Sequence, residues 1–255
     1  MINYDNYVNC INYNLTLNPD DWEFKSNINY TGTLEHVSRE EGDKYLYKIR
    51  SNYASFYYSK KDFLTNLCYK NDAFGKTRKS DFQDFAYCSP TNLRYIYQTL
   101  LILDYVKSEM LNNLNIIEIG GGYGGLAFYI KNIAPIFGVK VLSYTIFDLP
   151  AATQLQKKYL AAHGMDVQVA LLDSVESVHL EQNSFLISNY AYSEIEMDLQ
   201  KRYTERVLNP YVSHGFLAWN MIQIYEFIQN KTISFKREVP LTGAYNYFVT
   251  FAPTR

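Results

Sequence analysis

The sequence predicts an α/β fold in which helices cover both faces of a mostly parallel sheet. From residue 115 onward, short apolar runs of strand length alternate with segments whose apolar residues recur at helical spacing. This alternation is typical of a parallel sheet wrapped by helices. Five glycines follow the first of these apolar runs, within residues 120–125. A chain of 255 residues is long enough to bury a full core around such a sheet.

The helices and strands can be placed in order along the chain. Ser89 and Pro90 are residue types favoured at the N-cap and the first position of a helix, and an apolar face continues from there to about Met110. Gly164 stands where a glycine commonly ends a helix. The elements expected after residue 115 are strands at 116–119, 140–147, 167–172, 184–188 and 215–219, helices at 126–136, 151–162 and 195–208, and two further strand-like runs at 232–238 and 245–251.

The N-terminal third of the chain is harder to interpret. Residues 1–88 lack clean periodicity, although 43–58 and 60–70 have helical character and 75–81 is typical of an exposed loop. We therefore predict two parts. Residues 1–88 form a mostly helical region that packs on the main domain and covers its substrate side, and residues 89–255 form the main domain.

Composition excludes several classes of protein. The formal net charge of −2 gives no sign of affinity for a polyanion, so nucleic acid is not expected as the partner. Cys10, Cys68 and Cys88 are far apart in sequence and form no CxxC pair, which favours reduced thiols over disulfides or a zinc site. The sequence begins without a signal-peptide pattern, and no apolar run approaches the ~20 residues of a membrane helix. We expect a soluble, cytoplasmic protein with no membrane partner, and the sequence does not indicate an oligomeric state.

The glycine-rich turn predicts a nucleotide-like ligand. Glycine allows positive φ and lets a ligand approach the main chain without meeting a Cβ atom. The helix that follows offers unpaired N–H groups and the positive end of its dipole. Gly120, Gly122 and Gly125 also satisfy the dinucleotide fingerprint G-x-G-x-x-G, which by itself is a weak signal. The glycines alone do not choose between cofactors.

Ligands of open α/β sheets bind outside the carboxyl ends of the strands, where the strand order reverses. Asp148 follows the second expected strand, where a carboxylate can accept hydrogen bonds from ribose hydroxyls; its alternative role is to cap the next helix. Asp173 has the same ambiguity, with an adenine amino group as the candidate partner. The loops at the opposite edge carry His163, His179 and His214, so among the histidines only His36 is left as a candidate base.

Three stretches carry a resemblance to a known family. The run Glu118-x-Gly120-x-Gly122-x-Gly124 resembles the first strand and turn of class I S-adenosylmethionine (SAM)-dependent methyltransferases, which have a Rossmann-like fold. Together with residues 147–160 and 183–194, it makes residues 89–255 similar to the sugar O-methyltransferases of bacterial capsule and other surface-polysaccharide gene clusters. The resemblance implies a terminal antiparallel strand pair and transfer of a methyl group from SAM to a small sugar or nucleotide sugar.

The resemblance also implies which residues contact the cofactor. Gly120, Gly122 and Tyr123 are expected to line it, and Asp148 to hold the ribose. Asn189 is expected near the methionine part. The rest of the predicted cofactor set is Glu118, Leu149, and, near the adenine, Asp173 and Ser174.

A sugar hydroxyl must lose its proton during methyl transfer, which calls for a base within hydrogen-bond reach. Tyr192 and Glu194 follow the fourth expected strand and are the leading candidates, although Glu194 could instead cap a helix and Tyr192 could pack in the core. His36 is a further candidate, supplied by the N-terminal part. A phosphate or phosphoramidate acceptor would need no base, only a Lys or Arg to position it.

Three other possibilities remain open at this stage. Asp173, Glu194 and Asn220 could supply oxygen ligands to a magnesium ion if they converge, but spacing cannot show convergence and we predict no metal. An NAD(P)-dependent oxidoreductase is a second alternative for the glycine turn. A catalytically idle fold that binds a partner protein is a third.

Overall fold

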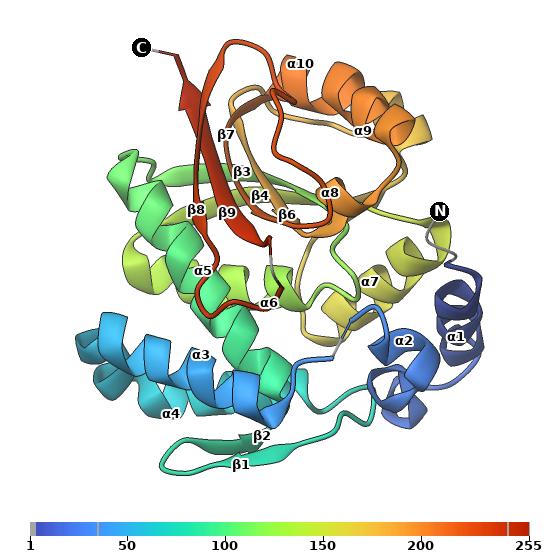
Figure 1. Ribbon diagram of the computed structural model, residues 1–255. Helices are drawn as coiled ribbons and strands as arrows, with labels where there is room; N and C mark the ends of the chain where they lie inside the picture. Colours follow the sequence, from blue (N-terminus) through green and yellow to red (C-terminus); the bar gives the residue numbers. More distant parts are fainter. Residues whose placement is uncertain (1–3, 35, 244, 255) are drawn as a thin grey trace.

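The computed structural model describes residues 4–34, 36–243 and 245–254. Within these residues the centre of the molecule is a seven-stranded sheet with the order β5-β4-β3-β6-β7-β9-β8 (Figure 1). The strands are β3 (Asn113–Ile119), β4 (Lys140–Phe147), β5 (Gln168–Ala170), β6 (Ser184–Asn189), β7 (Val212–Trp219), β8 (Lys231–Arg237) and β9 (Tyr247–Pro253).

The order and direction of the strands confirm the predicted fold. Strands β3 to β7 pair in parallel, whereas β9 runs antiparallel to both β7 and β8. From β3 the chain moves outward through β4 to β5, and then returns to the other side of β3 with β6 and β7. The strand order therefore reverses between β3 and β6, which is the place where such sheets bind ligands. This is a Rossmann-like sheet, and the expected antiparallel strand, β9, lies between β7 and β8.

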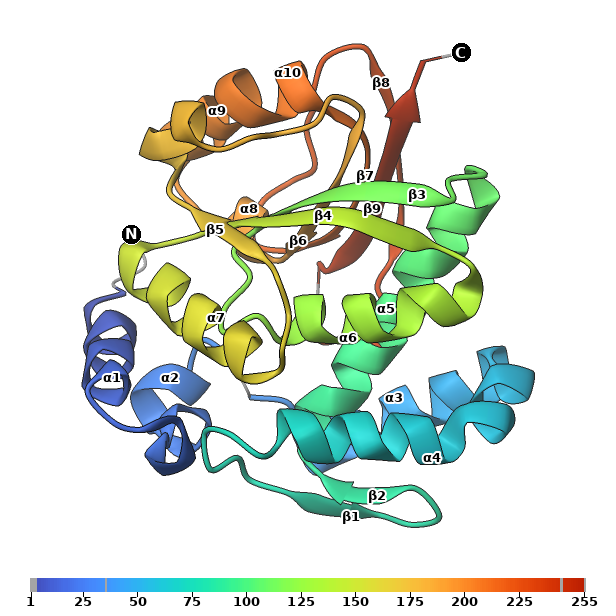
Figure 2. The ribbon, with the colours of Figure 1, turned by 180° about the vertical axis from the view of Figure 1, so that it is seen from behind.

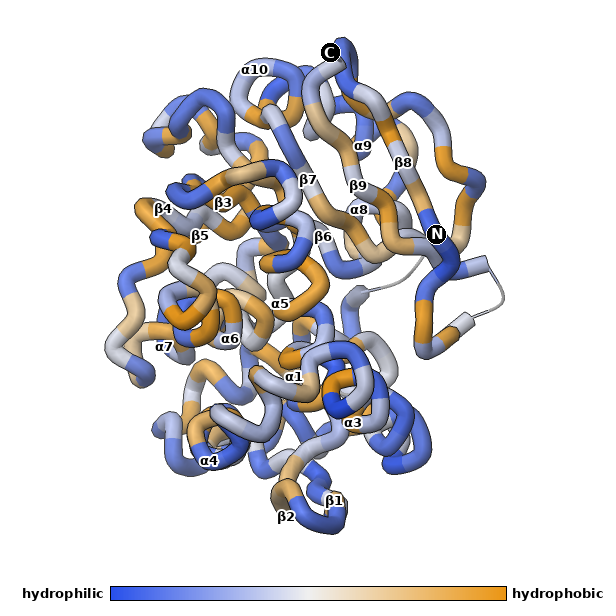
Figure 3. The backbone as a smooth tube through the Cα atoms, turned by 90° about the vertical axis from the view of Figure 1, so that its left-hand side faces the viewer, coloured by the Kyte–Doolittle hydropathy of each residue, from blue (hydrophilic) through white to orange (hydrophobic). Residues whose placement is uncertain are grey.

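Helices cover both faces of the sheet. One face carries α5 (Pro90–Ser108), α6 (Gly125–Ile133) and α7 (Pro150–Ala162), and the other carries α9 (Met197–Tyr203) and α10 (Asn209–Tyr211) (Figure 1). Apolar residues gather along β3, β4, α5 and α6 (Figure 3). This distribution follows from the sequence, because strands buried on both faces read as continuous apolar runs.

The helix expected at 195–208 is interrupted. The short helix α8 (Ala191–Glu194) ends because Ile195 has extended backbone angles, φ −75° and ψ 158°. The next helix, α9, begins only at Met197 and passes into a π-helical turn over Thr204–Leu208. Glu194 therefore closes α8 and does not begin a long helix.

The N-terminal part is mostly helical, as expected, but it also contains a hairpin. Its helices are α1 (Asp5–Leu15), α2 (Ile28–Thr31), α3 (Arg39–Asn52) and α4 (Ala54–Asn71). The predicted loop at 75–81 instead leads into β1 (Ser80–Phe82), which pairs with β2 (Ala86–Cys88). In Figure 2, α1 and α2 lie beside α7, and α3 and α4 lie below α5. Aromatic side chains of this part share one hydrophobic core with α5, α6 and α7. The division at residue 88 stays a prediction.

No helix among the described residues has both the length and the apolar character needed to cross a membrane. The three cysteines are buried free thiols.

A buried lysine joins the N-terminal part to the glycine turn. Lys25 Nζ donates to the carbonyl oxygen of Asn71 at 2.5 Å and lies 4.3 Å from the centroid of the Tyr123 ring. Asn71 in turn donates to Asn92, whose amide donates to the buried carboxylate of Asp72 at 2.9 Å. One polar network therefore runs from the N-terminal segment behind the glycine turn to the start of α5.

We expect Lys25→Ala to lower the free energy of unfolding by about 2–4 kcal/mol, because it leaves buried acceptors without their charged donor. Urea denaturation followed by circular dichroism measures this. Lys76→Ala is the control: Lys76 is exposed and lies 3.8 Å from Glu23 Oε2, so its loss should cost about 0.5 kcal/mol or less. Equal effects of the two substitutions would contradict a structural role for Lys25.

Candidate active site

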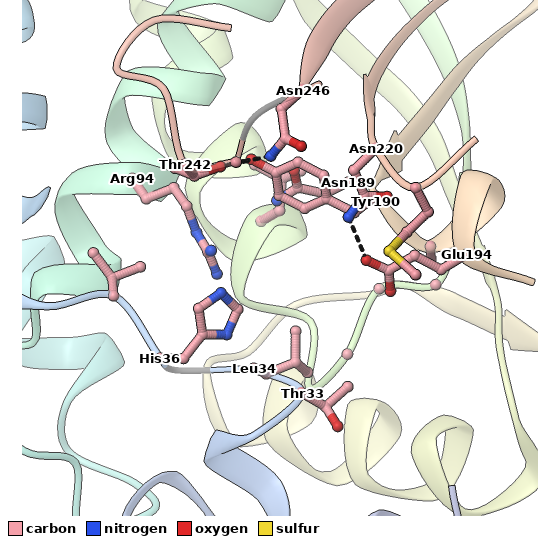
Figure 4. Close-up of a pocket in the computed structure, with 18 of the residues that line it drawn as sticks. Thr33, Leu34, His36, Arg94, Asn189, Tyr190, Glu194, Asn220, Thr242 and Asn246 are labelled. Atoms are coloured by element: carbon pink, nitrogen blue, oxygen red, sulfur yellow. Dashed lines mark hydrogen bonds between the residues drawn. The ribbon is translucent and has the colours of Figure 1, made fainter. Parts of the chain in front are cut away.

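A cavity of about 560 Å³ lies at the carboxyl ends of the central strands. Its volume is in the range of small-molecule sites. Its lining comes from several parts of the chain: the glycine turn after β3, the residue after β4, the residues at and after the ends of β6 and β7, helix α5, the N-terminal part and the connection between β8 and β9 (Figure 4). The N-terminal part contributes Tyr4, Tyr7, Thr33, Leu34, His36, Val37 and Glu41. The cavity thus lies where the strand order reverses, as the topology predicts.

The glycine turn forms one wall of this cavity. Gly120, Gly122 and Gly124 have φ values of 75°, 60° and 96°, a region that only glycine adopts without strain. A Cβ atom on Gly120 would lie 2.1 Å from the Cβ of Ala191, and one on Gly122 would lie 2.6 Å from Leu34 Cδ1. The turn therefore needs glycine both for its backbone angles and for its close neighbours.

The side chain of Asp148 is hydrogen-bonded to the backbone of the glycine turn. Its Oδ2 accepts hydrogen bonds from Gly122 N at 3.1 Å and from Gln156 Nε2 at 2.7 Å, and its Oδ1 accepts from Leu149 N at 2.7 Å. Leu149 is the N-cap of α7, and no side chain caps that helix. Burial raises the pKa of Asp148 to about 6, although these hydrogen bonds oppose the rise. Asp148 thus faces the cavity and does not cap α7.

Glu118, at the penultimate position of β3, is a second carboxylate in the cavity wall. Its Oε2 accepts a hydrogen bond from the hydroxyl of Tyr144 at 2.8 Å. Burial raises the pKa of Glu118 to about 7, and the Tyr144 hydrogen bond opposes that rise. The native state therefore binds this proton more tightly than the unfolded chain does, and stability falls as the pH increases from about 4.5 to about 7.

We expect Glu118→Gln to remove this pH dependence. The free energy of unfolding of the variant, relative to the unsubstituted protein, should rise by up to ~3 kcal/mol between pH 4.5 and pH 8. Urea denaturation at several pH values measures the difference, and Glu205→Gln, on an exposed helix surface, controls for the loss of one charge. A difference that does not change with pH would contradict the assignment.

The wall next to the glycine turn consists of the last residue of β6 and of residues that follow β6 and β7. The Asn189 side chain exchanges two amide hydrogen bonds with Gln98 of α5, at 2.9 and 2.8 Å. Glu194 Oε1 accepts a hydrogen bond from Asn220 Nδ2 at 2.6 Å. Both predicted residues, Asn189 and Glu194, line the cavity, as does His36 from the N-terminal part. Figure 4 shows these side chains around one space.

Tyr190 is a lining residue that the sequence did not reveal. It adopts a left-handed backbone conformation, with φ 69°, which is uncommon for a bulky residue. Its hydroxyl donates to Glu238 Oε1 and lies 3.3 Å from Thr242 Oγ1. Thr242 Oγ1 donates to the other oxygen of Glu238 at 2.6 Å, and Glu238 is 1% exposed. A buried carboxylate therefore stands behind the Tyr190 hydroxyl.

Tyr192, by contrast, lies in the core. Its hydroxyl is 2.9 Å from Thr204 Oγ1, and its ring packs against Trp219 and Phe227. Successive residues of α8 point about 100° apart, so Tyr192 turns away from the cavity that Ala191 lines. Burial also raises the pKa of Tyr192 far above its ordinary value. We therefore replace Tyr192 with Tyr190 as a candidate for the reaction.

Asp173 and Ser174 do not line the cavity either. Strand β5 ends at Ala170, earlier than expected, and a 3₁₀ helix (Leu172–Ser177) turns Asp173 toward the surface. There it forms ion pairs with Arg202 and Arg206. Ser174 Oγ instead donates to the carbonyl of Leu171 at 3.0 Å. The placement supports neither an adenine contact nor a shared metal site with Glu194 and Asn220. Among the described residues no group of three His, Cys, Asp or Glu side chains is placed to hold a metal ion.

Two more predicted cofactor residues, Tyr123 and Leu149, are absent from the described cavity lining. The buried ring of Tyr123 packs against Phe24 and Tyr159 behind the glycine turn. Tyr123 therefore supports the turn from the back. Leu149 is the N-cap of α7, next to Asp148.

The four histidines, all of them within the described residues, divide as expected. His163 packs against Phe128, with ring centroids 4.6 Å apart, His179 is exposed beside Glu181, and His214 lies 4.0 Å from Glu109. His36 is the one that lines the cavity.

Arg94 is another important residue that sequence reasoning did not find. It lies in the second turn of α5, is 3% exposed, and lines the cavity. A signal was present, because Arg94 is the only cationic residue between Pro90 and Val106, in a helix that is rich in apolar and aromatic residues. Tyr4, Tyr7, Thr242, Tyr245 and Asn246 carry no comparable sequence signal, because they reach the cavity only through the tertiary fold.

No protein-family model matches this chain, and no curated protein matches it significantly. Similar solved structures include three that are each 15% identical to it. They are the CMeT domain of the citrinin polyketide synthase (TM-score 0.46, covering 65% of this chain and 54% of that one), the PH0226 protein of Pyrococcus horikoshii (0.43, 64% and 92%), and M. capricolum TrmK in complex with S-adenosyl-homocysteine (0.39, 60% and 67%). All three scores are below 0.5, and the fold assignment rests on the strand order itself.

Proposed function

We propose that the protein is a SAM-dependent methyltransferase. One observation carries the proposal: the glycine turn after β3 is hydrogen-bonded to the carboxylate that follows β4, in the cavity where the strand order reverses. In that position Asp148 can accept hydrogen bonds from both ribose hydroxyls, while the glycine backbone leaves room for the rest of the cofactor. The reversed strand β9 favours SAM over a dinucleotide by analogy with known folds.

Bound SAM supplies a methyl group on a positively charged sulfur. The chain has to hold the acceptor oxygen in line with that methyl group and exclude water. A hydroxyl acceptor also needs its proton removed. Glu194 can accept that proton directly, and Tyr190 can pass it to Glu238 through its hydroxyl. His36 faces the same space and is the third candidate base.

We propose a small sugar or nucleotide sugar as the acceptor, in the synthesis of a surface polysaccharide. Tyrosine rings line much of the cavity, and flat aromatic faces suit the apolar faces of sugar rings. The N-terminal part supplies Tyr4, Tyr7 and His36 to this lining, which fits its proposed role as a cover on the substrate side. A phosphate or phosphoramidate acceptor is the alternative; among the described lining residues Arg94 is the one Lys or Arg able to position it.

Incubation with labelled SAM and a panel of nucleotide sugars and phosphorylated small molecules tests the function. Label on a sugar hydroxyl supports the main proposal, and label on a phosphate oxygen supports the alternative. Glu194→Gln and Tyr190→Phe, assayed on the same acceptor, identify the base by the larger loss of kcat at unchanged SAM affinity. A protein that binds NAD but not S-adenosylhomocysteine would overturn the proposal.

A further inference from the structure

Acidic side chains outnumber basic ones among the described residues that line the cavity. Its described lining contains four carboxylates, on Glu41, Glu118, Asp148 and Glu194, but no lysine and a single arginine, Arg94. The amino-acid tail of SAM carries two positive groups, the sulfonium and the ammonium, and one negative group, the carboxylate. Asp148 is assigned to the ribose and Glu118 is hydrogen-bonded to Tyr144. Glu41 and Glu194 are the two other acids of the lining, and they suit the positive groups of such a ligand. Its carboxylate has one permanently charged partner among the described lining residues, which is Arg94.

The sheet sets the direction in which the tail must run. Asp148 follows β4, Gly120 follows β3 and Asn189 ends β6, and these three strands are neighbours in the order β4-β3-β6. Neighbouring strands are ~4.8 Å apart, so the distance from the end of β4 to the end of β6 is ~10 Å. A cofactor whose ribose is bound at Asp148 can therefore extend its tail across the glycine turn and reach the vicinity of Asn189.

Helix α5 places Arg94 beyond Asn189. Gln98 is bonded to Asn189 through both amide atoms. Arg94 stands one helical turn earlier, ~6 Å along α5 and on the same face. Figure 4 shows its side chain extending into the cavity toward His36. The guanidinium thus lies on the side of the cavity where the tail should end.

We propose that Arg94 binds the carboxylate of the methionine part of the cofactor, an inference that rests on the proposed function. A guanidinium is always charged and can donate two parallel hydrogen bonds to a carboxylate. At a buried position the attraction is stronger than in water. Arg94 therefore determines specificity, because it selects cofactors that carry the carboxylate. With the ribose held at Asp148 and the carboxylate at Arg94, the sulfonium is held between these two contacts.

A comparison of two ligands on the unsubstituted protein is the first test. Isothermal titration calorimetry compares S-adenosylhomocysteine with its decarboxylated analogue, S-adenosyl-3-thiopropylamine, which keeps the ammonium and the thioether. We expect the protein to bind S-adenosylhomocysteine about 10- to 100-fold more tightly, since one charge-assisted bidentate contact is lost in the analogue. Equal affinities would overturn the inference without any variant. Failure of both ligands to bind would overturn the proposed function instead.

The second test uses Arg94→Gln. Its affinity for S-adenosylhomocysteine should fall about 10- to 100-fold, to the level of the analogue, while its affinity for the analogue changes less than about 3-fold. Arg94→Lys should recover part of the lost affinity, because lysine restores the positive charge but cannot donate the two parallel hydrogen bonds of a guanidinium. Lys107→Gln, an exposed position of the same helix, should change neither affinity.

Two outcomes of the second test would assign Arg94 a different role. If Arg94→Gln lowers the affinities for both ligands equally, Arg94 supports the structure of the site and does not contact the carboxylate. If it lowers methyl transfer but leaves both affinities unchanged, it contacts the acceptor. Either result overturns the inference, and neither would argue against a SAM site at Asp148. If the Arg94→Gln variant does not fold, the comparison of the two ligands on the unsubstituted protein is sufficient to test whether the site recognises the carboxylate.

Discussion

Replacing Asp148 with alanine is expected to abolish measurable binding of S-adenosylhomocysteine, with a loss of affinity of about 100-fold or more. Two ribose hydroxyls would lose a charged acceptor, and each such hydrogen bond contributes about 1.5–3 kcal/mol. The variant also frees the N–H of Gly122, which Asp148 holds at 3.1 Å. The turn should then lose its preset shape. Isothermal titration calorimetry and the thermal shift caused by the ligand both measure the effect.

Asp173→Ala is the matched control. Both aspartates follow a strand of the sheet, but Asp173 is exposed and paired with Arg202 and Arg206. Its removal should change the affinity for S-adenosylhomocysteine less than about 2-fold, because exposed ion pairs contribute little. If Asp173→Ala weakens binding as much as Asp148→Ala does, the placement of the cofactor is wrong.

The same carboxylate predicts how binding depends on pH. Burial raises the pKa of Asp148 to about 6, and a protonated carboxyl group accepts hydrogen bonds less well than a carboxylate. Affinity should therefore be highest above about pH 7 and fall as the pH decreases through 6. Asp148→Asn should remove this part of the dependence.

Gly120→Ala is expected to have the largest effect on stability. The new Cβ atom would lie 2.1 Å from the Cβ of Ala191, at a residue with φ 75°. Neither atom can move away by a side-chain rotation, so β3 and α8 must separate. We expect a loss of about 3 kcal/mol or more in the free energy of unfolding, together with loss of S-adenosylhomocysteine binding. Urea denaturation measures the first and calorimetry the second.

Two further variants separate the steric effect from the backbone effect. Gly138 has a similar φ of 70°, but a Cβ atom added there would have no neighbour within 4 Å among the described residues. Gly138→Ala should therefore cost only the ~1–2 kcal/mol of a left-handed residue. Ala191→Gly in the Gly120→Ala background should recover most of the difference between the two alanine variants. A Gly120→Ala variant no less stable than Gly138→Ala would contradict the close contact.

Features that depend on neighbouring residues could be predicted from the sequence. The strand Lys140–Phe147 has the expected bounds, because this segment is rich in β-branched and aromatic residues and is followed by Asp148, with Pro150 two residues further on. The glycine turn and Asp148 were also placed correctly, since both follow directly from the ends of strands. Less regular segments were predicted less well. Strand β5 is only three residues long, and α8 ends after four residues, because local packing there overrides the periodicity.

Tyr190 and Tyr192 show where sequence reasoning stopped. Both tyrosines follow β6, and the sequence analysis selected Tyr192, whereas the structure places Tyr190 in the cavity and Tyr192 in the core. The left-handed conformation of Tyr190 directs its hydroxyl to Glu238, 48 residues later in the chain. Tyr192 is turned into the core by the single turn of α8. The two orientations depend on contacts with residues distant in sequence. Tyr190 contacts Glu238 and Thr242, between β8 and β9, whereas Tyr192 contacts Thr204, Trp219 and Phe227.

The sequence by itself determined the α/β class, the order of the strands along the chain, and the glycine turn with its acid. These features arise from periodicity and backbone chemistry over a few residues. Only the tertiary structure decided that Arg94, His36 and Tyr190 share one cavity with Asp148. The parallel sheet brings Asp148 and Tyr190 together, because both follow the carboxyl ends of strands. Arg94 and His36 join them because α5 and the N-terminal part pack at the same end of the sheet.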